Sequence, residues 1–525
     1  MRHRAFARCA KSAIGLVLLC ATVLTVTTAA GAARAKAAAG PHRGGSLTIF
    51  EVASQWPGLD PATNTQDAAD VDYENAIFGQ LFEQGPGTSV INDLVQNYHY
   101  TAGGTKIVVN LRKGLKFSDG TPYTAQDVAS SIERDLTPSY ACLCDFDFAV
   151  LKSVVATSPT QFVLNLRHPS ATIIESFVSE APNWTVDPTA LASMGEAAYA
   201  QHPIGAGPFK VVSNSASASL VLTRNPLYWE KGHPYLNNLT FTSVANETSG
   251  LAGVEAHSAQ ILTGGAITAT TFREARQAGL LTPSIPGVLA NSIQMNDRIA
   301  PFNNILAREA LYYATNSAQI RNVINSGLGT VVECPCGPGS LYYEKTVPGY
   351  RTYDLAKAKA LVKKLGGLST QLMVLSTPQG VQAGEVIASQ WEAAGISVKI
   401  VPDTLQSVIA AYIHNSWQAT TEAGGGIDPE VGVQALPTRD LSKGIFSGTT
   451  NPTLDTLITQ ASETLNVKAR GVLIHRIYAL LAKDAYNIYT YSAPQRIIMS
   501  PKLGGVLLVP GQLGPAINWE NAYYK

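Results

Sequence analysis

The sequence has little charge and no excess of either sign. Lys and Arg number 38, Asp and Glu also number 38, and the four types make up only 14% of 525 residues. The first 35 residues carry five basic side chains and no acidic one, so the remainder has 33 basic against 38 acidic residues, a net charge of −5. Because nucleic-acid-binding domains carry a basic patch, we expect no nucleic-acid partner.

The sequence also lacks the short signatures of common hydrolases. It contains neither H-E-x-x-H nor G-x-S-x-G, and its nine histidines are scattered. His168, His202 and His233 each precede a proline, so we interpret them as surface residues of loops, with metal ligation as the alternative. We therefore expect no enzyme activity, no catalytic residue, no cofactor and no bound metal.

Long apolar runs are absent except near the N-terminus. Arg2, Arg4, Arg8 and Lys11 precede an uncharged run over residues 12–33, followed by A-x-A patterns at residues 30–32 and 33–35. This layout predicts a secretory signal peptide over residues 1–35, and hence export to the periplasmic or extracellular face of the membrane. A retained anchor and lipid attachment at Cys20 are the alternatives, although Cys20 lacks the small residue that normally precedes a lipidated cysteine.

Cysteine is scarce: four of the six remain beyond the predicted signal peptide, namely Cys142, Cys144, Cys334 and Cys336. Export permits disulfides, and four cysteines allow three pairings among which the sequence does not choose. Free thiols and four thiolates around a soft metal are the alternatives. The Cys-x-Cys spacing lacks the two-residue gap that is usual in zinc sites.

The most informative stretch that is present covers residues 106–134. Residues 107–111 are β-branched or apolar and predict a strand, and residues 118–122, Ser-Asp-Gly-Thr-Pro, predict a turn. Thr124 and Asp127 have the spacing of a box-like helix cap. Val128 and Ile132 then continue at helical spacing, so the stretch predicts a strand, a turn and a capped helix.

The same stretch resembles the signature of the extracytoplasmic solute-binding proteins, family 5, which serve peptide- and nickel-type ABC importers. That signature reads L-R-x-G-x-x-F-x-D-G-x-P-x-T-A-x-D-V. Its fixed positions are met by Leu111, Arg112, Gly114, Phe117, Asp119, Gly120, Pro122, Thr124, Ala125, Asp127 and Val128. We expect these residues to build a loop and a helix cap and not to touch the ligand.

Further blocks extend the resemblance over nearly all of residues 45–525. They are Leu-Asp-Pro at residues 59–61, Ile-Gly-Ala-Gly-Pro-Phe at 204–209, Arg-Asn-Pro-Leu-Tyr-Trp at 224–229, and the helical patterns of residues 301–314 and 353–361. The resemblance implies an α/β, two-lobed, periplasmic-binding-protein-like fold with three domains, type II and cluster C-like. It places domain I at residues 45–85, 200–290 and 490–525, domain II at 86–199 and domain III at 291–489.

The resemblance also implies the function. Such a protein captures a peptide-like or other small solute between its lobes and delivers it to the permease complex of an ABC importer, here as a monomer. A metal or metallophore binder on the same fold, a sensor that shares the fold, and a secreted hydrolase are the alternatives.

The expected ligand contacts lie in both lobes. In peptide-binding members the loop at residues 422–429 resembles G-W-x-x-D-x-x-D-P, and its first Asp holds the α-ammonium group of the peptide. Alignment on Asp428 places Gly425 at that position, so only Glu422 could supply the charge, and Gly424 and its neighbours open space for a larger or less charged solute. Further contacts are expected from Ser54, Gln55, Trp56 and Asn296, and a pocket elsewhere beside a flexible loop is the alternative.

Overall fold

The stretch at residues 106–134 folds as the sequence predicts. Strand β5 (Lys106–Leu111) enters a turn, and helix α2 (Ala125–Asp135) follows. The Asp127 carboxylate accepts hydrogen bonds from the backbone N–H of Thr124 at 2.8 Å and from its hydroxyl at 2.7 Å, which closes the cap. The computed structural model describes residues 41–52, 56, 58–64, 68–85, 88–140, 142–145, 147–178, 180–264, 267–421, 451–511 and 514–525.

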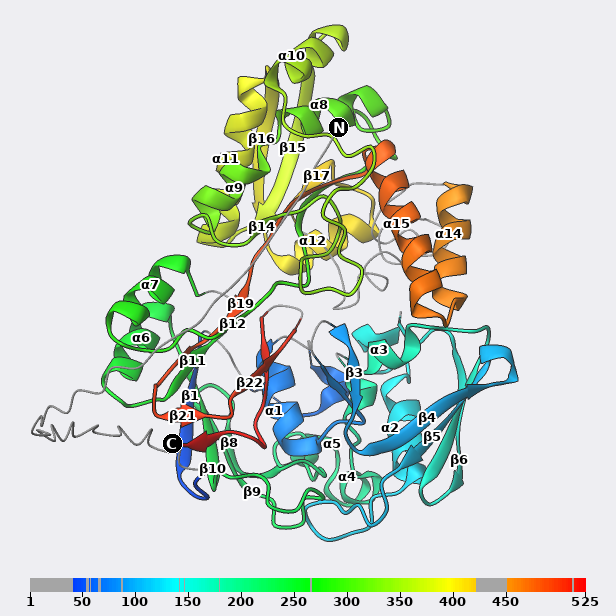
Figure 1. Cartoon of the computed structure of the whole chain (residues 1–525), viewed down its shortest axis with the longest axis vertical. Coiled ribbons are helices and arrows are strands. Elements are labelled where there is room, and N and C mark those ends of the chain that lie inside the picture. Colours follow the sequence, from blue (N-terminus) through cyan, green and yellow to red (C-terminus); the bar gives the residue numbers. More distant parts are fainter. Residues whose placement is uncertain are drawn as a thin grey trace, which may run out of the picture. The chain divides into compact units, whose positions relative to one another are not determined.

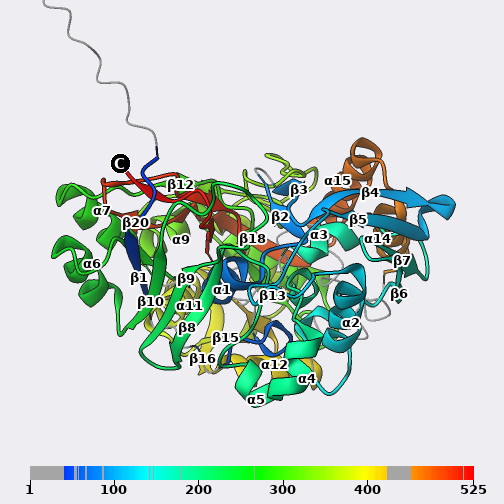
Figure 2. The ribbon, with the colours of Figure 1, turned by 90° about the horizontal axis from the view of Figure 1, so that it is seen from below.

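The first large sheet has six strands in the order β20-β11-β1-β10-β9-β8. Their bounds are β1 Ser46–Val52, β8 Phe209–Ser215, β9 Ser219–Arg224, β10 Asn238–Val244, β11 Ile261–Thr263 and β20 Ile498–Met499. β1 runs parallel to β10 and β11, while β9 and β20 run antiparallel to their neighbours. Figure 2 shows β1, β10, β9 and β8 side by side, with α6 and α7 at one flank.

The second sheet has four antiparallel strands in the order β4-β5-β7-β6. The strands other than β5 are β4 Val95–Thr101, β6 Leu151–Ser158 and β7 Gln161–Leu166. Inward residues such as Ile107, Val109 and Phe162 alternate with more exposed ones and pack on Val128 and Ile132 of α2. This alternation is the period-2 pattern of a sheet with one covered face. We call the part of the chain built on these two sheets the first lobe.

The third sheet has six strands in the order β14-β18-β13-β17-β15-β16 and forms what we call the second lobe. Its strands are β13 Asn291–Met295, β14 Thr330–Val331, β15 Leu368–Leu375, β16 Ile396–Asp403, β17 Ala419–Thr420 and β18 Asn487–Ser492. β15 runs parallel to both β16 and β17. Helix α11 (Pro378–Ala393) forms the crossover between the parallel strands β15 and β16 and buries Trp391 in the core of this sheet.

Two crossover segments connect the lobes. β12 (Ser284–Ile285) pairs antiparallel with β19 (Gln495–Arg496), so the outgoing and returning chains lie side by side, as Figure 1 also shows. The chain continues from β12 into β13 and returns from β18 into β19. Movement of one lobe against the other therefore has to bend these two strands.

The remaining elements cover the sheets or join strands. The other helices are α1 Ala68–Phe78, α3 Ile173–Phe177, α4 Pro188–Met194, α5 Glu196–Tyr199, α6 Glu247–Glu255, α7 Ala269–Gln277, α8 Ile305–Ala314, α9 Ser317–Ile324, α10 Leu355–Lys364, α12 Leu405–Ile413, α14 Pro452–Glu463 and α15 Val467–Lys483. The short strand pairs are β2 Phe82–Gln84 with β3 Val90–Asn92, β21 Leu503–Gly504 with β24 Tyr523–Tyr524, and β22 Leu507–Val509 with β23 Ala516–Asn518. Among the described residues, no helix is both long and apolar enough to cross a membrane.

Candidate functional site

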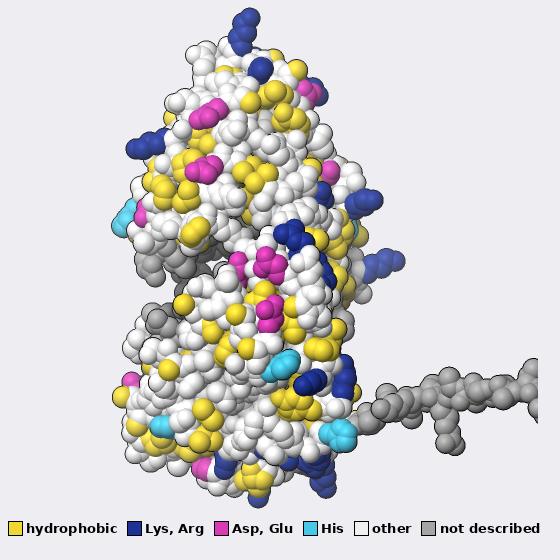
Figure 3. Space-filling view, turned by 90° about the vertical axis from the view of Figure 1, so that its left-hand side faces the viewer, with side chains coloured by type: hydrophobic (Ala, Val, Ile, Leu, Met, Phe, Trp, Pro, Cys, Tyr) yellow, Lys and Arg dark blue, Asp and Glu magenta, His cyan; other side chains and the backbone are white. Residues whose placement is uncertain are grey.

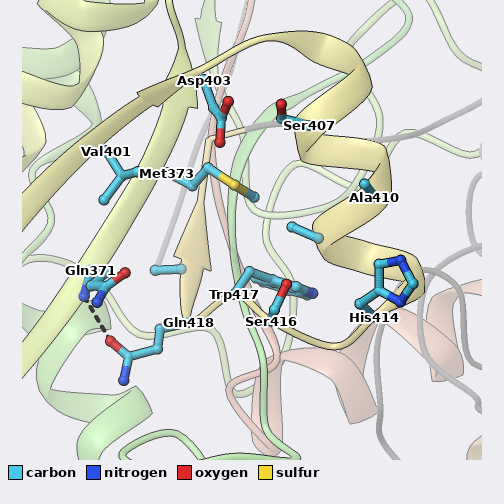
Figure 4. Close-up of a pocket in the computed structure, with 12 residues that line it drawn as sticks. Gln371, Met373, Val401, Asp403, Ser407, Ala410, His414, Ser416, Trp417 and Gln418 are labelled. Carbon is cyan, nitrogen blue, oxygen red and sulfur yellow. Dashed lines mark hydrogen bonds between the residues drawn. The ribbon is translucent and has the colours of Figure 1, made fainter.

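A cavity of about 290 Å³ opens between α12 and the strands β15, β16 and β17 of the second lobe. Figure 4 shows Trp417 between Asp403 and Ser407 on one side and Gln371 and Gln418 on the other, with His414 at the end of α12. Thr404 begins α12 by accepting a hydrogen bond from the Ser407 N–H, at 3.2 Å. Two turns of helix and a sheet face thus build a recess with polar and apolar walls, as small-molecule sites require.

The apolar wall holds Trp417 in place. Its ring packs against Tyr412 with centroids 4.9 Å apart and an interplanar angle of 77°, and Met373 and Val408 complete the cluster. Trp417 is only 4% exposed, and its indole Nε1 has no hydrogen-bond acceptor among the described residues. A buried N–H donor without an acceptor is costly, so a group that accepts from it would relieve that cost.

The polar side chains that line the recess differ in how many of their hydrogen bonds are already made within the protein. The Gln418 side-chain oxygen accepts from the Gln371 N–H at 2.7 Å, and its nitrogen donates to the Ala300 carbonyl at 3.1 Å. Both ends of this amide are therefore already hydrogen-bonded within the protein. Asp403, at the end of β16, accepts from the Thr404 N–H at 3.0 Å through one oxygen. His414 lies exposed at the end of α12. The recess therefore has a carboxylate and an imidazole among its lining groups, and the Trp417 indole N–H is buried in its wall.

Asn296 lies behind this wall. It is fully buried, and its amide donates to Asn415 Oδ1 at 2.7 Å and to the Trp417 carbonyl at 2.9 Å, while its oxygen accepts from the Arg298 N–H at 3.2 Å. These bonds hold the turn between α12 and β17, in which Asn415 has a φ of 54°. The contacts give Asn296 a positioning role for Trp417, and its predicted direct contact with a solute stays a prediction.

Apart from Asn296, Trp56 is the only predicted ligand residue among the described residues, and it does not line this recess. Trp56 is buried in the core around β1, in the first lobe, where its carbonyl accepts from Asn214 at 3.2 Å. Ser54 and Gln55 lie outside the described residues, as do Glu422, Gly424, Gly425 and Asp428. The chain nevertheless leads from the cavity into that loop, because β17 ends at Thr420 and the Thr421 N–H donates to the Met373 carbonyl at 3.2 Å. The role of the loop at residues 422–429 stays a prediction.

The four cysteines form two separate pairs. Cys142 and Cys144 are joined by a disulfide and belong to the core of the four-stranded sheet. Cys334 and Cys336 are free thiols that lie in a different core, with α14 and α15. The four cysteines therefore do not meet at one metal site. The described residues contain no group of three or more His, Cys, Asp or Glu arranged to hold a metal ion.

Two signature blocks meet at a buried carboxylate that sequence reasoning did not single out. Arg112 stacks over the Trp229 ring at 3.9 Å and donates to the Asp93 carbonyl at 2.5 Å. The Asp93 carboxylate accepts from the Trp229 indole at 3.0 Å and from the Gln80 N–H at 3.2 Å. The signature residues Arg112 and Trp229 therefore hold the first lobe together, in line with the structural role expected for the signature.

Asp93 belongs to an acidic group with Glu83 and Glu520. Burial raises the pKa of Asp93 to about 6. Burial and then the nearby Glu520 and Asp93 raise the pKa of Glu83 to about 8, and burial raises that of Glu520 to about 7. These carboxyl groups hold protons more tightly in the folded than in the unfolded protein, so their contribution to stability is complete below about pH 4.5 and is lost as pH rises through the folded pKa values.

Replacing Glu83 with glutamine is expected to flatten this pH dependence. Between pH 5 and pH 8 the free energy of unfolding of the unmodified protein should fall through this group, and Glu83→Gln should remove about 3 kcal/mol of that fall, since one pKa unit corresponds to ~1.4 kcal/mol. Urea unfolding at pH 5, 6.5 and 8 measures it. Glu385→Gln, at an exposed position of α11, is the control, and an equal slope in both variants would refute the assignment to Glu83.

Lys and Arg side chains do not gather into one patch on the side drawn in Figure 3. There, Lys and Arg side chains are interspersed with acidic, hydrophobic and uncharged ones. This distribution agrees with the near balance of charge in the sequence.

Comparisons with known proteins agree on the family. The model of "bacterial extracellular solute-binding proteins, family 5 Middle" matches residues 89–432. The glutathione-binding protein GsiB of Pectobacterium atrosepticum is 25% identical over 495 residues, which cover 89% of this chain and 92% of GsiB.

Solved structures show the same fold. The oligopeptide-binding protein AppA of Bacillus subtilis, in complex with a nonapeptide, is 20% identical, with a TM-score of 0.76 over 92% of this chain and 100% of AppA. NikA of Staphylococcus aureus, in complex with Ni(L-His)2, is 19% identical, with a TM-score of 0.73 over 91% of this chain and 100% of NikA. The two-lobed, mixed α/β architecture expected from the sequence is thereby confirmed.

Proposed function

Because the chain belongs to the bacterial extracellular solute-binding proteins of family 5, we propose that it captures a peptide-like or other small solute between its two lobes for delivery to the permease of an ABC importer. Solute contacts from both lobes stabilise the closed arrangement, so binding shifts an equilibrium that the paired crossover strands permit. No catalytic residue and no cofactor enter this proposal.

The observation that carries the proposal is the recess beside β17. Its buried indole N–H has no acceptor among the described residues, and the chain leads from it directly into the loop at residues 422–429. A peptide-like solute presents amide carbonyls, which are suitable acceptors for the Trp417 N–H. The glutathione-binding protein GsiB and AppA, solved in complex with a nonapeptide, support an amide-rich solute.

The sequence of the loop at residues 422–429 restricts the class of solute that we propose. Gly425 stands where peptide-binding members carry the carboxylate for an α-ammonium group, and a buried ammonium without a carboxylate is costly. We therefore propose a solute that is larger or carries less charge at its amino end than a free short peptide, unless Glu422 supplies the charge.

The signal-peptide pattern of residues 1–35 indicates where in the cell the protein acts. We propose an exported, monomeric protein that lacks residues 1–35, with lipid attachment at Cys20 as the alternative. N-terminal sequencing of secreted material decides between them. The domain boundaries given above are part of the same proposal, and separate expression of residues 291–489 tests whether the second lobe folds alone.

Replacing Trp417 with phenylalanine is expected to weaken solute binding by roughly 5- to 20-fold. This is the loss of one hydrogen bond of about 1–1.8 kcal/mol, with the apolar packing largely kept. Mass spectrometry of material released by denaturation identifies what co-purifies, and calorimetry with that compound, glutathione and di- to pentapeptides measures the affinity.

Trp56→Phe is the matched comparison. Trp56 is also a buried indole without a described acceptor for its N–H, but it lies in the first lobe. If the affinity falls for Trp56→Phe and not for Trp417→Phe, the solute binds at the predicted contacts around residues 54–56 and not in the recess. Unchanged affinity in both variants would exclude a solute hydrogen bond to either indole N–H.

A further inference from the structure

A segment of the second lobe is hydrogen-bonded to the outgoing crossover segment and to β18, from which the returning segment continues. In residues 332–339, which we call the clasp, the Pro335 carbonyl accepts from the Ala290 N–H at 3.1 Å, and the Gly337 N–H donates to the Val288 carbonyl at 2.8 Å. The Gly339 N–H donates to the Gly287 carbonyl at 2.9 Å. These three bonds tie the clasp to the outgoing crossover chain.

The clasp is also tied to the returning chain and to the first lobe. The Val332 N–H donates to the Thr490 carbonyl at 3.2 Å, and β14, just before the clasp, pairs with β18. Just after the clasp, the Leu341 N–H donates to the Thr88 hydroxyl at 3.3 Å, in the turn between β2 and β3. A change of conformation in the clasp is therefore transmitted to the strands on which the lobes move.

The clasp contains the two free thiols. Cys334 and Cys336 are fully buried, and their sulfur atoms lie 3.2 Å apart. The Cys334 thiol also lies 3.3 Å from the Cys336 carbonyl, and the Cys336 sulfur lies 3.5 Å from the Tyr478 hydroxyl. Two thiols in contact at the same Cys-x-Cys spacing as the bonded pair Cys142–Cys144 are placed to form a disulfide after a small shift.

We propose that Cys334 and Cys336 are a redox pair that closes a disulfide in the exported protein, and that this disulfide stiffens the clasp on the crossover strands. The oxidant is a small-molecule or protein disulfide, RSSR, of the kind that persists outside the cytoplasm. Because both thiols are buried, the exchange takes place when the clasp opens locally or before it docks during folding.

The exchange has two balanced steps. The Cys334 thiol gives its proton to solvent, and its sulfur attacks RSSR, so that one S–S bond forms while the other breaks and releases RS⁻, which takes up a proton. The Cys336 sulfur, after losing its proton, then attacks the Cys334 sulfur and releases the second RS⁻, which is protonated likewise. Two thiols are oxidised and RSSR is reduced to two RSH.

The surroundings assign the attacking role to Cys334. The hydrogen bond with Cys336 lowers the pKa of the Cys334 thiol, whereas burial raises the pKa of Cys336. The thiolate is the nucleophile in such exchanges, so Cys334 is the favoured attacking residue for as long as its contact with Cys336 persists when the clasp opens.

Peptide mapping tests the bond. Trypsin releases residues 322–345, which contain Cys334 and Cys336 and no other cysteine, and residues 135–152, which contain Cys142 and Cys144. Protein reduced, refolded and treated with oxidised glutathione is alkylated under denaturing conditions without reductant. We expect the 322–345 peptide to be unalkylated and lighter by two hydrogen atoms than its reduced form. Alkylation of both cysteines, or a bond between the two peptides, would overturn the proposal.

Hydrogen exchange tests the stiffening. Oxidation should slow exchange of the Ala290, Gly337 and Gly339 amides, which donate in or to the clasp, by about tenfold. The variant Cys334→Ala/Cys336→Ala should show no change with oxidised glutathione, and Cys142→Ala/Cys144→Ala should respond as the unmodified protein does. Equal exchange rates in the oxidised and reduced protein would overturn the coupling to the clasp.

Discussion

Replacing Glu175 with glutamine is expected to destabilise the protein by about 3 kcal/mol and to favour separation of the lobes. Glu175 on α3 of the first lobe accepts from Arg470 on α15 of the second lobe at 2.7 Å. The Arg470 side chain is only 2% exposed, so the variant leaves a buried guanidinium without this carboxylate. Losing one partner of a buried ion pair costs a few kcal/mol because the remaining charge stays desolvated.

The setting of this pair explains why its loss should open the lobes. Arg470 also donates to the Tyr342 hydroxyl, so its position within the second lobe does not depend on Glu175. The Ala171 N–H, near α3, donates to the Ser462 carbonyl of α14 at 2.7 Å, so the pair is part of a larger contact between lobes. Without the charge pair, the contact loses an ion pair with a buried guanidinium, and the radius of gyration of the solute-free protein should increase.

Urea unfolding and small-angle scattering provide the two measurements. Glu463→Gln is the matched control, because Glu463 lies 3.8 Å from His168 in an exposed pair across the same contact, where a cost below about 0.5 kcal/mol is expected. Glu175→Gln/Arg470→Met removes both charges and should recover part of the loss. A cost below about 1 kcal/mol for Glu175→Gln, with an unchanged radius, would show that the pair does not hold the lobes.

Elements set by short-range chemistry were predictable from the sequence. The strand, turn and cap at residues 106–134 depend on neighbours within a few positions, and the structure contains them. Helix α1 shows the limit of a local apolar pattern. Apolar residues continue beyond its last residue, Phe78, but Gly79 has a φ of 70° and Phe82 begins β2. A left-handed glycine ends a helix readily, and the apolar residues after it are buried in a strand instead.

Contacts between distant segments were not predictable. The signature identifies Arg112 and Trp229 separately, but their meeting at Asp93 depends on how the first lobe folds. In the same way, Trp417 stands in a sequence without any binding motif, and only the structure shows its N–H buried beside a cavity. Cysteine spacing limits the pairings, but the separation of the two pairs into different cores follows from topology.

The clasp leads to a second large effect, at Gly337. A Cβ atom at this position would lie 2.0 Å from the Ser492 Oγ and 2.3 Å from the Gly287 carbonyl oxygen, so any larger residue collides with both crossover chains. We expect Gly337→Ala to destabilise the protein by about 3 kcal/mol or more, because the Gly287 backbone and the Ser492 side chain both have to move.

Gly471→Ala separates this effect from a general response to a lost glycine. Gly471 lies within α15, and a Cβ there would meet only Tyr342, at an ordinary contact distance of 3.5 Å, so the change should be neutral or stabilise by up to about 1 kcal/mol. Thermal and urea unfolding compare the two variants, and hydrogen exchange at Ala290 and Gly339 reports on the clasp itself. If Gly337→Ala unfolds like the unmodified protein and keeps these amides protected, the clasp does not depend on close backbone approach, and its grip on the crossover strands is weaker than the three hydrogen bonds imply.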